Sequence, residues 1–458
     1  MIQFYIVTEF ENIDRAKVGK FQRRLAVTAA LGPFTDAFNE FGASISLIAV
    51  GIIFNLPPVL IVMATAAYWV GVAGGAIVGG IASDAIGRKR LFLYDTIGMA
   101  LFAIMSAVAT DYVTYFLTRL ALGIFIGIDY AAAVPLLAEY SPTHKRGSLL
   151  SYEKIFFMFG TIATVGIGLL FTTEVGTLLA WRYDFFIAAI PAIILFFLRL
   201  EIPASLRWAQ ASGREDLIPG ILEKLKKEGI DIDPSTIKVE RKPLIRENLH
   251  EFFNWKNSRS IAYIFWIGAA YALTVNLVSV YASTVLKTLG ASSSTSILGT
   301  LIIDIVGTLG VVLTLLVVDR IGRKMVGLLG FVLSAIPLLV LIIAENFHFM
   351  SIPLVISMFA LFFFINVGLV GTLQYIPAAE IGTTRTRGLS VGWEKLFEFG
   401  LALPALTLYA IIGLYYSLIY DTIMVILSGV ILYYVGIETS GKTLEENAAS
   451  IGLDTAEF

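Results

Sequence analysis

Residues 138–154 read AEYSPTHKRGSLLSYEK, and residues 379–395 read AEIGTTRTRGLSVGWEK. The two stretches align without a gap at an offset of 241 residues. A second pair recurs at an offset of 235 residues, with DAIGRK at 84–89 and DRIGRK at 319–324. Two motifs that repeat in the same order at nearly the same distance predict two structurally equivalent halves.

The composition predicts that these halves lie in a membrane. The 458 residues are 57% hydrophobic and 15% charged, whereas a soluble domain carries roughly 25% charged residues. A bilayer core needs ~20 apolar residues per helix. Apolar runs fall at 25–53, 58–83, 91–109, 112–138, 148–172, 177–198, 260–286, 293–318, 325–344, 351–377, 389–413 and 415–436. The expected fold is therefore an all-α membrane protein with twelve transmembrane helices in two pseudo-symmetric six-helix bundles.

The same composition excludes several functions. A net charge of −2 leaves no basic excess for nucleic acid. With no cysteine and three histidines, thiolate chemistry and a metal cluster are not expected. We expect no cofactor. The nucleotide-binding pattern Gly-x4-Gly-Lys-Ser/Thr is absent, which disfavours ATP-driven transport. The regions outside the spans show no catalytic constellation, so we do not expect an enzyme.

Positive charge predicts the orientation in the membrane, because cytoplasmic loops retain Lys and Arg. Of 33 such residues, 28 fall in the termini and the loops of one side, and two, Arg182 and Lys287, fall on the other. We therefore expect a multi-pass protein of the cell membrane with both termini in the cytoplasm. The predicted parts are a first bundle at 1–200, a cytoplasmic linker with short helices at 201–258, a second bundle at 259–437 and a cytoplasmic tail at 438–458.

Six motifs in this order resemble a known family. They are the two copies of Asp-x-x-Gly-Arg-Lys, the two copies of Glu-x6-Arg-Gly, the segment Pro203–Trp208 and the segment Glu438–Glu446. They are similar to the signatures of the major facilitator superfamily, and within it to the branch of sugar porters and metabolite:proton symporters. Some segments resemble phosphate:proton symporters instead, including Thr35–Asn39 and Gly127–Tyr130. The resemblance implies the major facilitator fold and transport of a solute between the two halves.

Acidic and basic residues at the expected cytoplasmic helix ends form a candidate gate. They are Asp84, Arg88, Glu139 and Arg146, with the repeat-related Asp319, Arg323, Glu380 and Arg387. They are either simple interfacial anchors or, as the resemblance implies, a network of ion pairs that closes the cytoplasmic side. If these ion pairs are exposed, each pair contributes ~0.2–1 kcal/mol to stability.

Ionisable residues within the spans are candidates for proton coupling, because burying one in a bilayer costs at least ~2.5–3.5 kcal/mol. Asp36 and Glu40 share one face of the first span, and Arg119 and Asp129 lie in the fourth. Depth along the helices pairs Arg119 with Glu40 and places Asp129 near Asp36. Sugar porters use a helix-one Asp with a helix-four Arg similar to Arg119, and Asn39 aligns with that Asp. The alternative is a static ionic network that fixes helix packing.

Two lysines related by the repeat are candidates for the solute site. Lys154 and Lys395 each lie about 10 Å into a span, and each follows a glutamate, Glu153 or Glu394. They either bind the solute or neutralise those glutamates. Further candidates are Tyr271, Asn276, Tyr375 and Trp393. Asp304 is either a second proton site or a partner in a helix–helix hydrogen bond.

The favoured hypothesis is a proton-coupled symporter that works by alternating access, functions as a monomer and binds a small anionic metabolite of carboxylate or phosphate type. The two cationic lysines favour an anion, and the missing pair of helix-seven amides found in sugar porters disfavours a hexose. The alternatives are a porter or uniporter for a neutral sugar, and a membrane sensor that binds a solute without transporting it. The expected partners are the solute, protons and the lipid bilayer.

Overall fold

The structure is a computed structural model that describes residues 9–174, 177–241 and 243–450. These residues contain helices and no β-strand. The first half consists of α2 (Lys20–Ile53), α3 (Pro58–Ile86), α4 (Arg88–Ala107), α5 (Tyr112–Tyr140), α6 (Arg146–Glu174) and α7 (Thr177–Leu200). The second half consists of α11 (Ser258–Thr288), α12 (Ser293–Ile321), α13 (Arg323–Asn346), α14 (Ile352–Ile365), the π-helical turn η5 (Asn366–Gly371), α15 (Pro377–Ile381) and α16 (Arg387–Val435).

The prediction of twelve spans is confirmed. Ten of the described helical segments are long and apolar enough to cross a membrane, and α2 supplies an eleventh. Gly413, with a φ of 75°, interrupts the long helix α16; its second part, Ile411–Val435, is one of the ten, and its first part supplies the twelfth span. A positive φ is accessible to glycine at little cost, so Gly413 permits the break between the two parts of α16.

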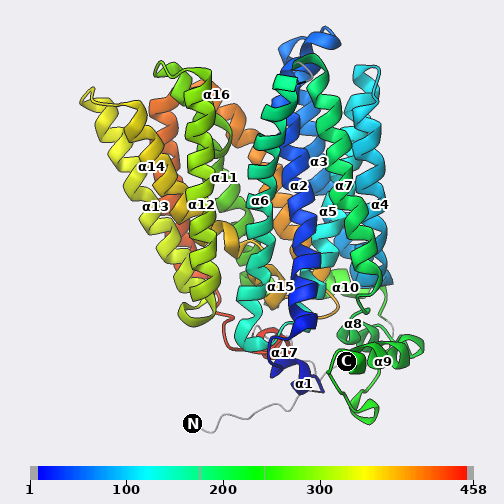
Figure 1. The fold of residues 1–458 in the computed structure, drawn as a ribbon. Helices are drawn as coiled ribbons and strands as arrows, with labels where there is room; N and C mark the ends of the chain where they lie inside the picture. The colour runs from blue at the N-terminus through cyan, green and yellow to red at the C-terminus, as the bar shows by residue number, and fades with distance from the viewer. Residues whose placement is uncertain (1–8, 175–176, 242, 451–458) are drawn as a thin grey trace.

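Figure 1 shows the two groups of helices side by side, with α2 to α7 on one side and α11 to α14 on the other. Close contacts between helices depend on glycine. A Cβ atom at Gly75 of α3 would lie 2.2 Å from the carbonyl oxygen of Ile124 in α5. At Gly392 of α16, a Cβ atom would lie 2.3 Å from the carbonyl oxygen of Ala76 in α3. Glycine in α3 therefore permits close packing against α5, and Gly392 permits close contact between the two halves.

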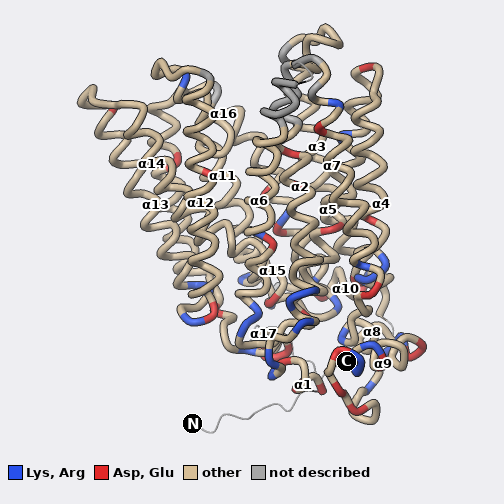
Figure 2. The backbone as a smooth tube through the Cα atoms, in the orientation of Figure 1, with Lys and Arg blue, Asp and Glu red and all other residues tan. Residues whose placement is uncertain are grey.

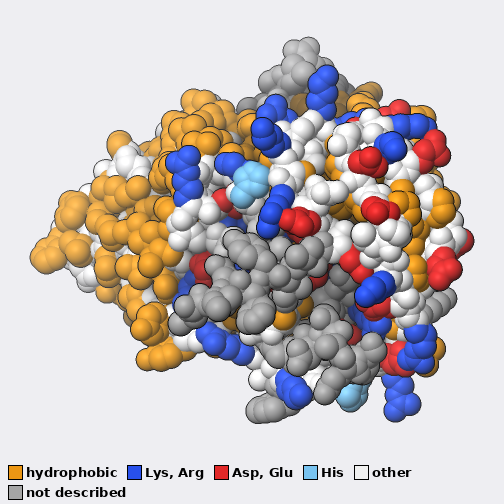
Figure 3. Space-filling view, turned by 90° about the horizontal axis from the view of Figure 1, so that it is seen from below, with side chains coloured by type: hydrophobic (Ala, Val, Ile, Leu, Met, Phe, Trp, Pro, Cys, Tyr) orange, Lys and Arg blue, Asp and Glu red, His pale blue; other side chains and the backbone are white. Residues whose placement is uncertain are grey.

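Short helices gather at one end of the bundles, which we call the linker face (Figure 1). They are α1 (Glu11–Asp14), η1 (Thr143–Lys145), α8 (Leu206–Ala211), η2 (Glu215–Leu217), α9 (Ile218–Lys227), η3 (Pro234–Thr236), α10 (Ile245–Phe252), η4 (Trp255–Asn257) and α17 (Leu444–Ser450). Charged residues concentrate at this face, and only a few lie deep in the bundles (Figure 2). Seen from below, Lys, Arg, Asp and Glu cover the linker face, while hydrophobic side chains cover the side of the second half (Figure 3).

Candidate functional site: a central cavity and an ionic latch

A cavity with a volume of about 70 Å³ lies between the two halves. Its polar and aromatic lining includes Glu40, Trp69, Lys154 and Thr161 from the first half, and Tyr271, Asn276, Ser279, Asp304 and Glu398 from the second. Both halves therefore contribute groups that can bind hydroxyls or charges.

Lys154 connects the two halves across this cavity. Its ammonium group donates a hydrogen bond to the hydroxyl of Tyr271 at 2.9 Å. The turn η5 leaves room for this pair, because a Cβ atom at Gly371 would lie 2.9 Å from the Tyr271 ring and 3.1 Å from Lys154 Cε. The irregular turn therefore adjoins the site, as π-helical turns often do.

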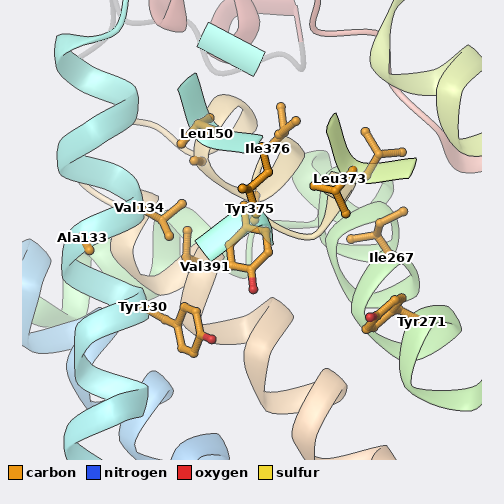
Figure 4. Close-up of a cluster of buried hydrophobic side chains, with 14 of the residues drawn as sticks. Tyr130, Ala133, Val134, Leu150, Ile267, Tyr271, Leu373, Tyr375, Ile376 and Val391 are labelled. Atoms are coloured by element: carbon orange, nitrogen blue, oxygen red, sulfur yellow. The ribbon is translucent and has the colours of Figure 1, made fainter. Parts of the chain in front are cut away.

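Lys395, the repeat partner of Lys154, does not line the cavity. Its ammonium group pairs with Glu398 at 2.5 Å and with Glu394 at 3.2 Å. It also lies 4.3 Å from the centre of the Tyr375 ring. Figure 4 labels Tyr375 and Tyr130, whose ring centroids are 6.0 Å apart. The structure thus places Lys395 in an internal ion-pair network of the second half.

Three other candidates for the solute site lie away from the cavity lining. Tyr375 is buried against Tyr130. The Trp393 ring packs against Phe252 and Phe253 of α10, with centroids 6.0 and 5.3 Å away. Glu153 is fully buried, and neither of its carboxylate oxygens has a hydrogen-bond partner. The rotation of each helix about its axis determines which of its residues face the cavity. The sequence alone does not specify that rotation.

The candidates for proton coupling lie in two separate places. Asp36 is fully buried and accepts hydrogen bonds from the hydroxyls of Tyr68 and Tyr130, each at 2.5 Å. Glu40 lines the cavity and accepts a hydrogen bond from the indole nitrogen of Trp69 at 3.1 Å. Asp36 and Glu40 therefore lie next to the central site.

The pairing predicted from depth is wrong. Arg119 forms no ion pair with any residue that the structure describes; its guanidinium lies 4.3 Å from the centre of the Tyr68 ring and 5.1 Å from that of Phe185. Asp129 pairs instead with Arg199 of α7 at 2.6 Å. Equal depth was not enough, because the side chains leave their helices in different directions. Arg119 reaches Asp36 only through Tyr68, which contacts both.

Asp304 is an unpaired carboxylate on the cavity wall. It is 6% exposed, and its carboxylate forms no hydrogen bond or ion pair with the described part of the chain. The expected alternative of a helix–helix hydrogen bond is therefore not observed. Glu398 was missed at the sequence level, although a charge inside the apolar run 389–413 is the same signal that singled out Lys395.

The eight candidate gate residues lie together at the linker face, where they form what we call the latch. Asp84 of the first half accepts hydrogen bonds from the backbone N–H groups of Gly388 and Leu389 at 3.0 and 2.9 Å. Asp319 of the second half does the same with Gly147 and Ser148, each at 2.9 Å. Each aspartate therefore caps the first turn of a helix in the opposite half, where the helix dipole favours an anion.

Ion pairs strengthen the first copy of the latch. Glu139 binds Arg88 of its own half at 2.8 Å and also binds Arg387 of the other half. In the second copy, Glu380 binds Arg323 of its own half at 2.8 Å, while Arg146 turns to Asp14 of α1 at 3.1 Å. The two copies of the latch therefore form the same aspartate caps, but their arginines bind different partners.

The expectation that these ion pairs are exposed and weak is wrong. Arg88, Glu139 and Arg387 are at most 1% exposed. Removing one partner of a buried pair costs about 3–5 kcal/mol, because a charge is left without a partner. Neighbouring helices and the linker cover these residues, and the sequence pattern gave no sign of that cover.

The tail extends the latch. Asp14 and Glu445 both bind Arg207, at 2.7 and 2.8 Å. Burial raises the pKa of Glu445, but the positive charge and hydrogen bond of Arg207 outweigh burial and lower this pKa to about 2. The beginning of the chain, the linker and the tail therefore meet at one arginine.

Two repeat-related bundles around a central cavity, closed on one face by bonds that bridge them, define a secondary transporter of the major facilitator superfamily. Residues 23–450 match the profile of a family described as "Sugar (and other) transporter". The chain belongs to this family.

Named relatives cover most of the chain. The arabinose-proton symporter of Bacillus subtilis is 26% identical over 86% of this chain and 87% of that protein. The glucose transporter GlcP of Staphylococcus epidermidis is 27% identical over 81% of this chain and 85% of that protein.

Solved structures share the fold. The proton:xylose symporter XylE bound to 6-bromo-6-deoxy-D-glucose matches with a TM-score of 0.80 and 21% identity, over 94% of this chain and 99% of that chain. An inward-open structure of XylE from E. coli matches with a TM-score of 0.64 and 20% identity, over 93% and 98%.

Proposed function

We propose that the protein is a proton-coupled sugar symporter that works by alternating access. The observation that carries this proposal is the central cavity, which both halves line and which the latch separates from the linker face. A solute held there contacts both halves, so its binding can drive their relative movement. The relatives named as an arabinose-proton symporter and a glucose transporter support a sugar as the solute.

The charges of the cavity also support a sugar over the anionic metabolite favoured by the sequence analysis. Three carboxylates line it, those of Glu40, Asp304 and Glu398; Glu398 pairs with Lys395, which leaves two carboxylates against one lysine, Lys154. An anion would meet more negative than positive charge there. Sugar hydroxyls can donate to carboxylates and accept from Lys154. The anion prediction rested on two lysines, and the structure places one of them, Lys395, against two glutamates.

Asp36 is the proposed coupling group, with Glu40 beside it. A buried carboxylate holds its proton until a change of surroundings stabilises the charged form. The hydroxyl of Tyr68 contacts Asp36, and Arg119 lies over the Tyr68 ring. A small shift of α2, α3 or α5 during the cycle would change this environment. The excess of Lys and Arg makes the linker face the proposed cytoplasmic side.

The test is uptake into proteoliposomes with pentoses, hexoses, polyols, carboxylates and phosphate, with and without an imposed proton gradient. We expect the gradient to drive accumulation of at least one sugar and of none of the anions. Asp36→Asn should abolish accumulation and retain sugar exchange. Sugar uptake that is independent of the proton gradient would establish a uniporter. Accumulation of anions alone would support the anion hypothesis. Binding without transport would establish a sensor.

A further inference from the structure

A second buried ionic cluster lies inside the first half, apart from the cavity. We call it the acid cluster; it consists of Asp95 (α4), Asp129 (α5), Glu153 (α6) and Arg199 (α7). All four side chains are at most 2% exposed, and none of them lines the central cavity. Asp95, Asp129 and Arg199 meet at one point inside the bundle, and Glu153 of a fourth helix is subject to the charges of Asp129 and Arg199.

One nitrogen of Arg199 holds two of the three acids. Its Nη1 atom lies 2.9 Å from Asp95 and 2.6 Å from Asp129, and it also donates to the carbonyl oxygen of Phe92 at 2.7 Å. The two aspartates are immediate neighbours because they share this nitrogen. The Nε and Nη2 atoms of Arg199 have no hydrogen-bond partner.

The neighbouring helix α2 leaves space for the cluster. A Cβ atom at Gly32 would lie 1.7 Å from an oxygen of Asp129 and 3.2 Å from Nη2 of Arg199. Any side chain at position 32 would therefore displace the Asp129 carboxylate. The backbone of α2, four residues before Asp36, forms one wall of the cluster.

Glu153 is the third acid, and it has no hydrogen-bond partner among the residues that the structure describes. Both of its oxygens are buried without one, and the charges that act on it are those of Asp129, Arg199 and Lys395. An acid with no donor beside it cannot be stabilised as an anion by hydrogen bonds. The adjacent Lys154 points to Tyr271 instead, so Glu153 belongs electrostatically to the acid cluster.

The charges of the cluster do not balance. Three carboxylates face one guanidinium, so full ionisation would leave two negative charges without partners inside a membrane. The penalty for each such ion is several kcal/mol. Lys395 acts on Glu153 from the other half, but it already pairs with Glu394 and Glu398. Retaining protons on the acids removes this penalty.

The position of the cluster links it to Asp36 and to the linker face. Tyr130 follows Asp129 in α5, and its hydroxyl contacts Asp36. On the other side, Lys89 donates to the carbonyl oxygens of Arg199 and Leu200, at the end of α7. A proton that leaves Asp36 toward the linker face therefore has the acid cluster on its way.

We propose that Asp95, Asp129, Glu153 and Arg199 form a second proton-binding site that exchanges its proton with the linker face during the transport cycle. This inference extends the proposed proton coupling and rests on it. The site binds a proton only, and no covalent bond changes.

Infrared spectroscopy of the reconstituted protein tests the bound proton, because a protonated carboxylic acid has its own C=O band. The measurement uses the Asp36→Asn background, in which the proposed coupling acid is absent. We expect part of the band to disappear when Glu153→Gln is added, whereas Asp216→Asn, at an exposed linker pair, leaves it unchanged. Identical spectra with and without Glu153→Gln would overturn the proposal.

Exchange into heavy water tests whether the proton moves. The Glu153-dependent band should exchange about tenfold faster or more when Glu139→Gln weakens the latch, since ~1.4 kcal/mol is a factor of ten. A band that exchanges equally slowly in both proteins would mean a static, structural proton and would contradict the proposal. Failure of proton coupling shows separately, because sugar uptake by the unsubstituted protein would then be independent of the proton gradient.

Discussion

The pairs Glu153-Lys154 in α6 and Glu394-Lys395 in α16 occupy equivalent places in the two halves, yet they are partnered differently. In α16, the lysine pairs with Glu394 and with Glu398 one turn later. In α6, the lysine faces the cavity with a neutral tyrosine as its partner, and the glutamate faces the acid cluster. The repeat fixes where the backbone lies, whereas residues outside the repeat decide what each charge does. Lys395 is held by ion pairs within the second half, whereas Lys154 is available to a solute in the cavity.

The largest expected effect is on stability, from Lys395→Met. This change leaves Glu394 and Glu398 without a cation, and breaking a buried ion pair costs about 3–5 kcal/mol. Thermal unfolding in detergent measures the loss. Lys154→Met is the matched control, because it removes a bond to a neutral hydroxyl. Equal destabilisation by the two substitutions would show that the lysines are equivalent after all.

The second prediction concerns transport, where Lys154 is expected to be the important lysine. Lys154→Met should lower sugar uptake by about 10- to 100-fold, because a hydrogen bond to a charged group contributes about 1.5–3 kcal/mol. Lys154→Arg keeps the charge and should retain part of the activity. Initial uptake rates into proteoliposomes give the result, and unchanged rates in Lys154→Met would remove this lysine from the site.

The third prediction concerns the latch, where the two halves also differ. Glu139 binds an arginine of each half, whereas among the described residues Glu380 binds one arginine, Arg323 of its own half. Glu139→Gln should therefore open the linker face more than Glu380→Gln, by about tenfold for ~1.4 kcal/mol. The chain has no cysteine, so the labelling rate of a single Ser83→Cys reporter, buried beside Gly388, measures the opening. If Glu380→Gln raises the labelling rate as much as Glu139→Gln does, the difference in arginine partners between the two copies of the latch does not affect its opening.

The smallest expected effect comes from the tail. Glu445 has a side chain 27% exposed, so solvent screens its bond to Arg207, and Glu445→Gln should cost only about 1 kcal/mol. Because the pKa of Glu445 is lowered to about 2, its contribution is complete above its ordinary value near 4.5 and is lost as the pH falls toward 2. Unfolding of the two proteins should therefore differ at neutral pH and converge in acid. A constant difference at every pH would exclude this ion pair as the cause.

The sequence was sufficient for the architecture, because apolar length and an internal repeat are properties of the chain itself. It also identified the acids and bases of the latch. Partners were harder to predict. Arg199 lies just past the apolar run 177–198 and was counted with the linker, although it is buried against Asp95 and Asp129. Such a pairing depends on how α7 rotates against α4 and α5, which only tertiary packing determines.

The turn η5 shows a second limit. A helical pattern predicts the face of each residue from a constant 3.6 residues per turn. The wider turn at Asn366–Gly371 breaks that count just before Tyr375. Tyr375, a candidate for the solute site, packs against Tyr130 and does not line the cavity. Sequence spacing gave no sign of this irregularity.

Asp14 and Glu445, near opposite ends of the chain, are both held by Arg207 under the closed latch. The linker face cannot open widely while both remain bound, so each turnover should separate and rejoin the two ends. Fluorophores placed near residues 11 and 446 would then report single cycles by energy transfer. Bulky fusions at either end would bias the very motion under study.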